Sequence, residues 1–422
     1  MRILFFSHYF PPEVNAPAVR TFEHCREWVQ CGHEVHVVTC VPSHPQGRVY
    51  DGYQSRLRLQ RECVEGINVH RVWTYVAANR RFLRRSLGYL SYMISAVPAG
   101  RRLPRPDVIV ATSPQFFCAC AGFLASKLLR RPWLFELRDI WPESIVAVGA
   151  MRNRLLIRLL EAIELRLYDD AERIVAVTEA FKANLLRRGV PEGKVEVVPN
   201  GIVPDSWAPG DPSVLRSELG LDARFVVSYV GTHGMAHNLD TLLDAAELLR
   251  DESDVHVVTV GEGAEFDRLR RTREERGLSN VTMVGQVPHD RAKSYLLASD
   301  VLIVLLRKAA LFRTVLPSKV FEAMAAGKPI ILGVEGEAKR VVESAGAGLC
   351  IEPENARELA DAVVRLKSDD ALRQRLGRSG RAAVRELYDR RVLARRMLDV
   401  VEACRASRDG PATGETDGQR CC

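Results

Sequence analysis

Short apolar runs alternate with amphipathic segments along the first half of the chain. Residues 2–7 are apolar and end in a polar residue, which is typical of a buried parallel strand that opens into a loop. A helical pattern at 18–30, a stop at Gly32 and a second apolar run at 33–39 predict a β-α-β unit with a right-handed crossover. Further segments expected before residue 200 are a helix at 116–129 and strands at 107–112, 133–136, 173–178 and 195–198.

The same alternation starts again after a stretch rich in proline. Residues 203–212 contain three prolines and a glycine, which indicates a linker. The strands expected after it are 225–230, 255–260, 281–284, 301–305 and 329–332, and the helices are 239–250, 264–276, 291–298 and 318–326. The sequence therefore predicts an α/β protein of two Rossmann-like domains facing a cleft, with ligands at the carboxyl ends of the strands.

These patterns also set expected domain boundaries. The first domain is expected at 1–203 and the second at 213–385. One long charged helix is expected from 356 to 405 with breaks at Gly377 and Gly380, and its part from 386 to 405 is expected to return to the N-terminal domain. The tail at 406–422 is rich in Gly, Thr and Asp, so it is expected to be disordered.

Composition points to a globular protein in a reducing cytoplasm. Of the 422 residues, 47% are hydrophobic and 27% charged, and the ten cysteines include no CxxC pair. Only four apolar residues follow Met1 and Arg2, whereas a signal peptide needs about seven. No apolar run approaches the roughly 18 residues of a membrane span. Because no clustered His and Cys residues appear, no metal is expected either.

Positive charge is concentrated in the N-terminal half. Residues 1–200 contain 28 Lys and Arg against 19 Asp and Glu, whereas the remainder contains 32 against 34. A basic, apolar and aromatic segment at 80–94 has the character of a helix that lies on an anionic membrane. The residues expected to contact the membrane are Arg80, Arg81, Phe82, Arg84, Arg85, Tyr89 and Tyr92. The alternative is a core helix with a solvated basic end.

The most specific segment is residues 315–330, VLPSKVFEAMAAGKPI. Its pattern predicts a helix that Ser318 caps and Gly327 ends. The N-terminus of a helix is a site for phosphate, and Lys319 adds a cation in the first turn, where a structural helix would favour Asp or Glu. Glu322 lies one turn further along. The alternative interpretation is a capped surface helix with an ion pair.

This segment resembles the retaining glycosyltransferases of family 4, which have the GT-B fold, and the resemblance spans nearly the whole chain. It includes Gly231 and the motifs at 32–35 (GHEV), 199–202 (PNGI), 261–263 (GEG), 284–287 (VGQV), 298–300 (ASD) and 346–348 (GAG). Within the family, the chain is most similar to fucosaminyltransferase-type enzymes of bacterial surface polysaccharides. That likeness depends on 9–13 (YFPPE), 138–144 (RDIWPES) and 316–319 (LPSK).

The resemblance implies a donor site in the second domain, after the Gly231 turn. Glu322 would accept hydrogen bonds from the ribose, Lys319 and Ser318 with the amides near Thr314 and Val315 would hold the diphosphate, and Gln286 and Val287 would contact the base. The chain departs from the family in two places. Thr314 replaces the first glutamate of the paired-glutamate motif, and the basic pair after Gly231 is missing. Candidates to replace that pair are His233, His237, Arg307 and Arg313.

Carboxylates of the first domain are candidates for the acceptor site. Asp139 follows a predicted strand, so it is expected to face the cleft, where a carboxylate orients or deprotonates an acceptor hydroxyl. Alternatively, it caps the following turn. Arg138, Glu143 and Glu13 are the other expected acceptor or cleft residues.

The sequence thus predicts transfer of a UDP-linked sugar, an N-acetylated deoxyhexosamine, to a lipid-linked or polysaccharide acceptor with retention of configuration. Catalytic roles are expected for Asp139, Lys319 and Glu322. The enzyme is expected at the cytoplasmic face of the inner membrane, without cofactor or nucleic-acid partner. Alternatives are a nucleotide-sugar epimerase of the same fold, a non-catalytic scaffold and an NAD-dependent oxidoreductase, although the loop at 7–13 lacks the glycines of a dinucleotide site.

Overall fold

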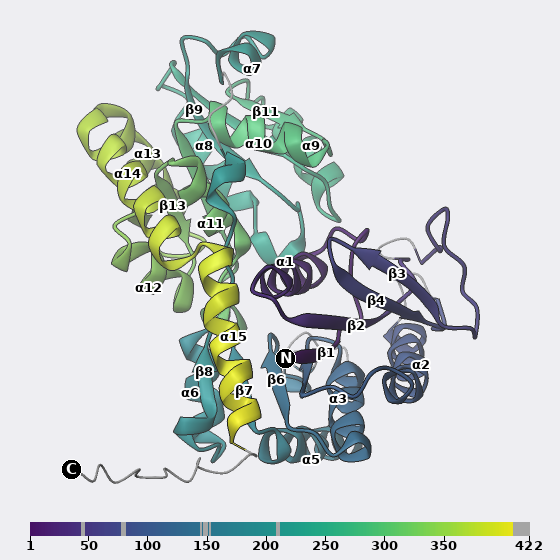
Figure 1. Ribbon diagram of the computed structural model, residues 1–422. Coiled ribbons are helices and arrows are strands. Elements are labelled where there is room, and N and C mark those ends of the chain that lie inside the picture. The colour runs from purple at the N-terminus through teal and green to yellow at the C-terminus, as the bar shows by residue number, and fades with distance from the viewer. Residues whose placement is uncertain are drawn as a thin grey trace, which may run out of the picture. The chain divides into compact units, whose positions relative to one another are not determined.

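The computed structural model describes residues 1–43, 47–76, 82–143, 146, 151, 153–207 and 212–407. The chain forms two compact units (Figure 1). Unit 1 comprises Met1–Pro199 and the C-terminal residues from Leu393, and unit 2 comprises Asn200–Val392. The cleft that the sequence predicts between two domains stays a prediction.

Unit 1 is built on an eight-stranded sheet in the order β3-β4-β2-β1-β5-β6-β7-β8. Its strands are β1 (Arg2–Phe6), β2 (Glu34–Cys40), β3 (Gln60–Val64), β4 (Ile67–Val72), β5 (Val108–Thr112), β6 (Trp133–Leu137), β7 (Arg173–Ala176) and β8 (Val195–Val197). All neighbours are parallel except β3, which pairs antiparallel with β4. Both faces of such a sheet are covered, which is why its strands are continuously apolar.

Helices cover both faces of this sheet. They are α1 (Ala16–Gln30), α2 (Phe82–Arg101), α3 (Phe116–Leu129), α5 (Arg154–Asp170), α6 (Glu179–Arg187) and α15 (Arg390–Ala406), with a 3₁₀ turn η1 (Glu192–Lys194). Leu4 and Phe6 of β1 pack in the core cluster of α2, α3, α5 and α6. Ile3 and Phe5 pack in the cluster of α1 and α15, because successive side chains of a strand point to opposite faces.

Unit 2 has a six-stranded parallel sheet in the order β11-β10-β9-β12-β13-β14. Its strands are β9 (Phe225–Val230), β10 (Val255–Val260), β11 (Val281–Val284), β12 (Val301–Leu305), β13 (Ile330–Gly333) and β14 (Gly348–Cys350). Its helices are α7 (Pro212–Glu218), α8 (Asp240–Leu248), α9 (Phe266–Glu275), α10 (His289–Ala298), α11 (Ser318–Ala326), α12 (Glu337–Ser344), α13 (Ala356–Ser368) and α14 (Asp370–Leu387). Short 3₁₀ turns are η2 (Pro204–Trp207), η3 (Met235–His237) and η4 (Ala310–Thr314). One face of the sheet packs on α8 and α13, and the other on α10, α11 and α12.

The single long helix expected from residue 356 is wrong. The structure has three helices there, and the breaks fall at Asp369, which caps α14, and at residues 388–389. Gly377 and Gly380 lie inside α14 instead of ending it. A Cβ on Gly377 would lie 2.2 Å from the carbonyl oxygen of Gly327, so this glycine allows α14 to approach the end of α11.

The β3–β4 hairpin lies outside the strands expected from the sequence. Its two-residue turn is Glu65-Gly66, both with positive φ, which is the geometry that suits a tight hairpin. Among the described residues, no helix is long and apolar enough to cross a bilayer.

Candidate functional site

The sheet of unit 2 has a topological switch point between β9 and β12. The chain proceeds from β9 to β10 and β11 on one side and from β12 to β13 and β14 on the other. Loops that leave the carboxyl ends of two such strands part in opposite directions, and ligands bind there in open α/β sheets. Gly231 follows β9 and Leu306 follows β12, so this edge is the candidate site of unit 2.

Glycines let two loops meet closely at this edge. Gly231 has φ +141° and Gly261 has φ +126°, a region that other residues rarely adopt. A Cβ on Gly261 would lie 2.2 Å from the carbonyl oxygen of Gly231, and a Cβ on Gly263 would lie 2.4 Å from that of His233. The loop after β10 therefore packs directly on the loop after β9.

Lys319 brings a cation from α11 to the end of β9. Its Nζ donates a hydrogen bond to the phenol oxygen of Tyr229 at 2.5 Å, and a Cβ on Gly231 would lie 2.6 Å from that same Nζ. Burial lowers the pKa of Lys319 to about 7, although the nearby Glu322 carboxylate opposes the shift. A half-buried cation at a switch point is a good receptor for an anion.

The start of α11 supports this role, but not by the predicted cap. The residue before the helix is Pro317, and no side chain caps the first turn, so the prediction of Ser318 as N-cap is wrong; Ser318 is the first helical residue. The amides of Ser318 and Lys319 donate to no other described residue. They are the unsatisfied first-turn donors that make a helix N-terminus attractive to phosphate. Glu322 lies one turn further, half-buried.

His233 supports the loop from inside. Its side chain is 0% exposed, packed edge-on against Tyr229 and Phe266, with Nδ1 3.1 Å from the carbonyl oxygen of Gly231. Burial lowers its pKa to about 4, so the ring is neutral. The ring therefore supplies no positive charge, and the predicted role of His233 in donor binding stays a prediction.

His237 does not supply a positive charge either. Burial and then the charge of Lys319 lower its pKa to about 4, and its Nδ1 lies 3.2 Å from the carbonyl oxygen of Leu305. This contact joins the loop after β9 to the end of β12.

The two arginine candidates differ in their surroundings. Arg313 is exposed and its Nε donates to Glu335 at 2.9 Å, so its charge is already paired. Arg307 follows β12, and its amide donates to the carbonyl oxygen of Ala236 at 2.9 Å. Its exposed guanidinium has no ion pair with any described residue. Among the residues that the structure describes, Lys319 and Arg307 are therefore the two cations available beside the loop after β9.

The remaining donor candidates lie on loops at the same edge. Gln286 is exposed and Val287 half-buried after β11, where Val287 packs on a small apolar cluster. Thr314 donates from its hydroxyl to Leu311, and the amide of Val315 donates to the carbonyl oxygen of Phe312 at 3.3 Å. The Val315 amide is thus already bonded, which weakens its predicted role as a phosphate donor.

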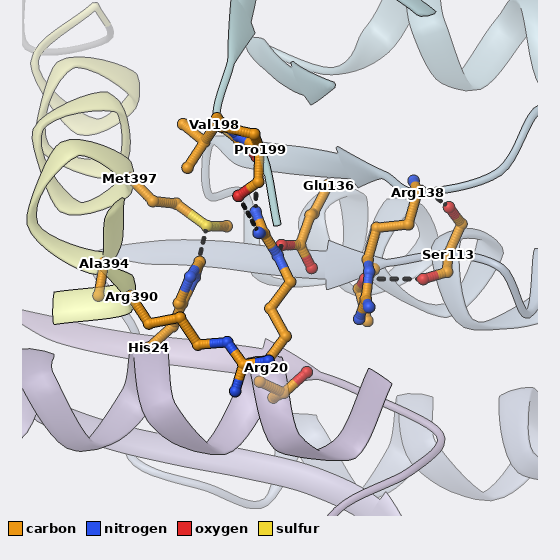
Figure 2. A network of polar contacts seen from close by, with 12 residues as sticks. Arg20, His24, Ser113, Glu136, Arg138, Val198, Pro199, Arg390, Ala394 and Met397 are labelled. Carbon is orange, nitrogen blue, oxygen red and sulfur yellow. Dashed lines mark hydrogen bonds and ion pairs between the residues drawn. The ribbon is translucent and has the colours of Figure 1, made fainter. Parts of the chain in front are cut away.

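Unit 1 has its own switch point, between β1 and β5. Ser113 follows β5, and its Oγ accepts hydrogen bonds from the amides of Arg138 (2.7 Å) and Asp139 (3.2 Å), which follow β6 (Figure 2). Asp139 is half-buried at this edge, as a candidate acceptor residue must be. Glu143 is exposed and lies 3.5 Å from the amide nitrogen of Asn184.

Glu13 has a structural contact instead of an exposed position. Its side chain is 1% exposed, and Oε1 accepts from the amide of Ser43 at 2.9 Å. It joins the loops after β1 and β2, and its predicted place at the acceptor or cleft stays a prediction.

Sequence reasoning missed a buried ion pair near the same edge. Arg20 of α1 donates to Glu136 at 2.7 Å and to the carbonyl oxygens of Val198 and Pro199, the last residues of unit 1 before the chain enters unit 2 (Figure 2). Burial raises the pKa of Glu136, but the positive charges of Arg20 and then of Arg138 outweigh burial. Together they lower the pKa of Glu136 to about 2. Arg20 is one of two arginines among several polar residues of α1, so the helix pattern alone does not single it out.

The predicted membrane segment is partly a core helix. Tyr92 of α2 is 0% exposed and donates to the carbonyl oxygen of Val38 at 2.7 Å, so its predicted contact with a membrane is wrong. Tyr89 is half-buried, with its hydroxyl 3.4 Å from that of Tyr9. Arg80 and Arg81, and the side chains of Phe82, Arg84 and Arg85, lie outside the described residues.

No metal site is evident in the part of the chain that the structure describes. There, no three His, Cys, Asp or Glu side chains are grouped to hold an ion.

Comparisons with known proteins agree with this geometry. The family of glycosyl transferases group 1 matches residues 214–383, and the glycosyl transferase 4-like domain matches residues 15–201. The putative colanic acid biosynthesis glycosyl transferase WcaI of Escherichia coli (strain K12) is 28% identical over 378 residues, which cover 86% of this chain and 91% of WcaI.

Solved structures show the same fold. Anabaena HepE, crystallised in complex with UDP, has a TM-score of 0.71 at 19% identity, over 96% of this chain and 100% of HepE. The sucrose-phosphate synthase of Thermosynechococcus elongatus has a TM-score of 0.74 at 20% identity, over 96% and 99%. The chain therefore joins a glycosyl transferase 4-like domain to a group 1 glycosyl transferase domain, and it is a glycosyltransferase of the GT-B fold.

Proposed function

We propose that this glycosyltransferase moves a sugar from a nucleoside diphosphate sugar, bound at the switch point of unit 2, to a lipid-linked or polysaccharide acceptor bound by unit 1. The donor is UDP-linked and carries an N-acetylated deoxyhexosamine. The bond from the anomeric carbon to the diphosphate breaks, a bond to the acceptor oxygen forms, and the anomeric configuration is retained. WcaI, named for colanic acid biosynthesis, and HepE, crystallised with UDP, support the acceptor class and the base.

The observation that carries the proposal is the position of the Lys319 ammonium against Gly231. Burial disfavours the charged form of Lys319 and lowers its pKa to about 7. A bound diphosphate interacts favourably with this ammonium and in turn stabilises its charged form. Negative charge on the leaving diphosphate grows in the transition state, where a fixed cation in a partly dry site is most effective. The first-turn amides of α11 add donors to the same anion.

Arg307 supplies the second positive charge. The family's basic pair after Gly231 is missing, and the two histidines that occupy that loop are neutral near pH 7. Arg307 follows β12 and Lys319 lies on α11. These two elements therefore provide the positive charge that the loop after β9 lacks.

Contacts to the nucleoside and acceptor complete the assignment. Glu322 accepts hydrogen bonds from the ribose hydroxyls, and Gln286 and Val287 offer backbone groups to the base. Asp139, with its backbone fixed by Ser113, orients the acceptor hydroxyl.

The enzyme acts without a metal or cofactor, peripherally at the cytoplasmic face of the inner membrane. The excess of nine positive charges in residues 1–200 supports attraction to anionic lipid.

The test is an incubation of purified enzyme with UDP-, GDP- and TDP-sugars and membrane extract, scored for nucleoside diphosphate release, with and without EDTA. We expect release from one UDP-sugar that depends on the extract and resists EDTA, and an α-linked product from an α-linked donor. If the enzyme transferred sugar from none of these donors, the donor assignment would be refuted. If EDTA abolished activity, a metal ion rather than Lys319 would stabilise the leaving diphosphate.

A further inference from the structure

Unit 1 has an arginine-lined cavity beside its edge strand β3. Its volume is about 680 Å³, and its lining includes Arg56, Arg58, Arg61 and Arg102 together with Leu57 and Leu59. The other lining residues are two glutamines, so no carboxylate faces the four guanidinium groups.

The four arginines have no counter-charge. None of their side chains forms a hydrogen bond or ion pair with another described residue. The nearest carboxylate along the chain, Glu62, is paired with Arg71 at 2.5 Å. Four like charges around one hollow repel one another, and a bound anion relieves that repulsion.

Protection of a sheet edge explains one of the four arginines only. Arg61 lies on β3, the edge strand, opposite His70 of β4, and charged side chains on edge strands block aggregation. Arg56 and Arg58 precede the strand, and Arg102 directly follows α2. These three residues reach the cavity from outside the strand, so edge protection does not account for the cluster.

A second basic cavity of unit 1 shows the usual arrangement. It measures about 410 Å³ and contains Lys127, Arg130 and Arg131, but Asp170 and Glu172 also line it. Lys127 is ion-paired with Asp170 there. The cavity at Arg56 differs because no described side chain balances its charge.

We propose that the cavity at Arg56, Arg58, Arg61 and Arg102 binds a phosphate group. Guanidinium groups match phosphate oxygens with paired hydrogen bonds. Leu57, between Arg56 and Arg58, is 86% exposed. An apolar side chain beside phosphate-binding arginines fits a phosphate carried by a membrane lipid, whereas free phosphate makes no use of it.

The test measures binding alone, so it does not depend on sugar transfer. The full-length R56Q/R58Q variant is compared with wild type and with R187Q/R396Q. Arg187 and Arg396 are exposed arginines of unit 1 outside the cavity, so both double variants lose the same charge. Each protein is sedimented with phosphatidylcholine vesicles with and without phosphatidylglycerol, and titrated calorimetrically with inorganic pyrophosphate. Thermal melting checks that all variants are folded.

We expect R56Q/R58Q to bind anionic vesicles about thirtyfold more weakly than wild type, since each arginine near an anionic surface contributes about 1 kcal/mol. R187Q/R396Q should bind nearly as wild type. Pyrophosphate binding that only R56Q/R58Q loses, without a vesicle effect, would support the phosphate site but assign it to a soluble ligand. Equal binding of both double variants to vesicles and to pyrophosphate would overturn the proposal.

Discussion

The ammonium of Lys319 lies 2.5 Å from the phenol oxygen of Tyr229 and 4.1 Å from the centre of its ring. The Tyr229 hydroxyl donates to the carbonyl oxygen of Thr232 at 2.7 Å, so its lone pairs are left to accept from Lys319. Tyr229 itself belongs to the buried core of unit 2. A rigid residue of the sheet thus holds the cation of α11 at the end of β9.

Replacing Tyr229 with phenylalanine should distinguish the hydrogen bond that positions Lys319 from the packing of the aromatic ring. Y229F keeps the ring below the ammonium but removes the hydrogen bond, and bonds to charged groups contribute about 1.5–3 kcal/mol. We expect kcat to fall at least about tenfold, with a smaller change in the donor KM. Steady-state kinetics measure this split. Y388F is the control, because Tyr388 is a half-buried tyrosine of unit 2 whose ring packs on Phe321. An equal loss in both variants would contradict the role of Tyr229.

Activity should depend on the charge of Lys319. The pKa of this group is about 7, and the protonated form is the useful one, so kcat/KM, which reports the free enzyme, should fall as pH rises through about 7. Bound diphosphate favours the cation, so the fall in kcat should occur at higher pH. K319R keeps its charge throughout this range and should lose the alkaline fall. An alkaline limb that K319R leaves unchanged would have to come from another group.

Lys319 should also lower the free energy of unfolding of the protein. Its lowered pKa means that the unfolded chain binds more protons than the folded one between about pH 7 and 10, so its contribution destabilises the fold and diminishes as pH rises in that window. K319M should raise the free energy of unfolding by about 1–2 kcal/mol, as when apolar side chains replace buried charges. Urea unfolding at pH 7 measures this. Transfer should be lost in the same variant, and a destabilised K319M would indicate that the cation holds unit 2 together.

The sequence predicted the sheets better than the site, for physical reasons. Buried parallel strands are continuous apolar runs. The strands predicted at 225–230 and 301–305 therefore have the same bounds as β9 and β12. Gly377 looked like a helix break because sequence does not distinguish a glycine that ends a helix from one that admits a neighbouring backbone. The burial of His233 and Tyr92 likewise depends on loops and strands far along the chain, which no local pattern reveals.

Arg307 and Arg313 offer a matched pair at the same edge of unit 2. Both are exposed arginines between β12 and α11, but Arg313 is paired with Glu335 whereas Arg307 is not. R307Q should reduce kcat about tenfold or more through loss of a charge-assisted contact to the diphosphate. R313Q should change kcat less than about threefold, because it removes an exposed ion pair worth at most about 1 kcal/mol. Equal effects on kcat would remove Arg307 from the donor site.

Glu322 provides the final test, because it is the residue of α11 that we propose binds the ribose of the donor. It lies one turn after Lys319 and is half-buried at the same edge. E322Q keeps the shape of the side chain but removes its charge and one of its two acceptor oxygens. Hydrogen bonds from two ribose hydroxyls to a carboxylate contribute about 1.5–3 kcal/mol, so the donor KM should rise about tenfold to a hundredfold. E386Q, at an exposed glutamate of α14, makes the same charge change elsewhere in unit 2 and should behave as wild type. Donor KM measured with the ribose and 2′-deoxyribose forms of the same UDP-sugar makes the test specific, since wild type should discriminate between them and E322Q should not. If E322Q still discriminates fully, another residue binds the ribose.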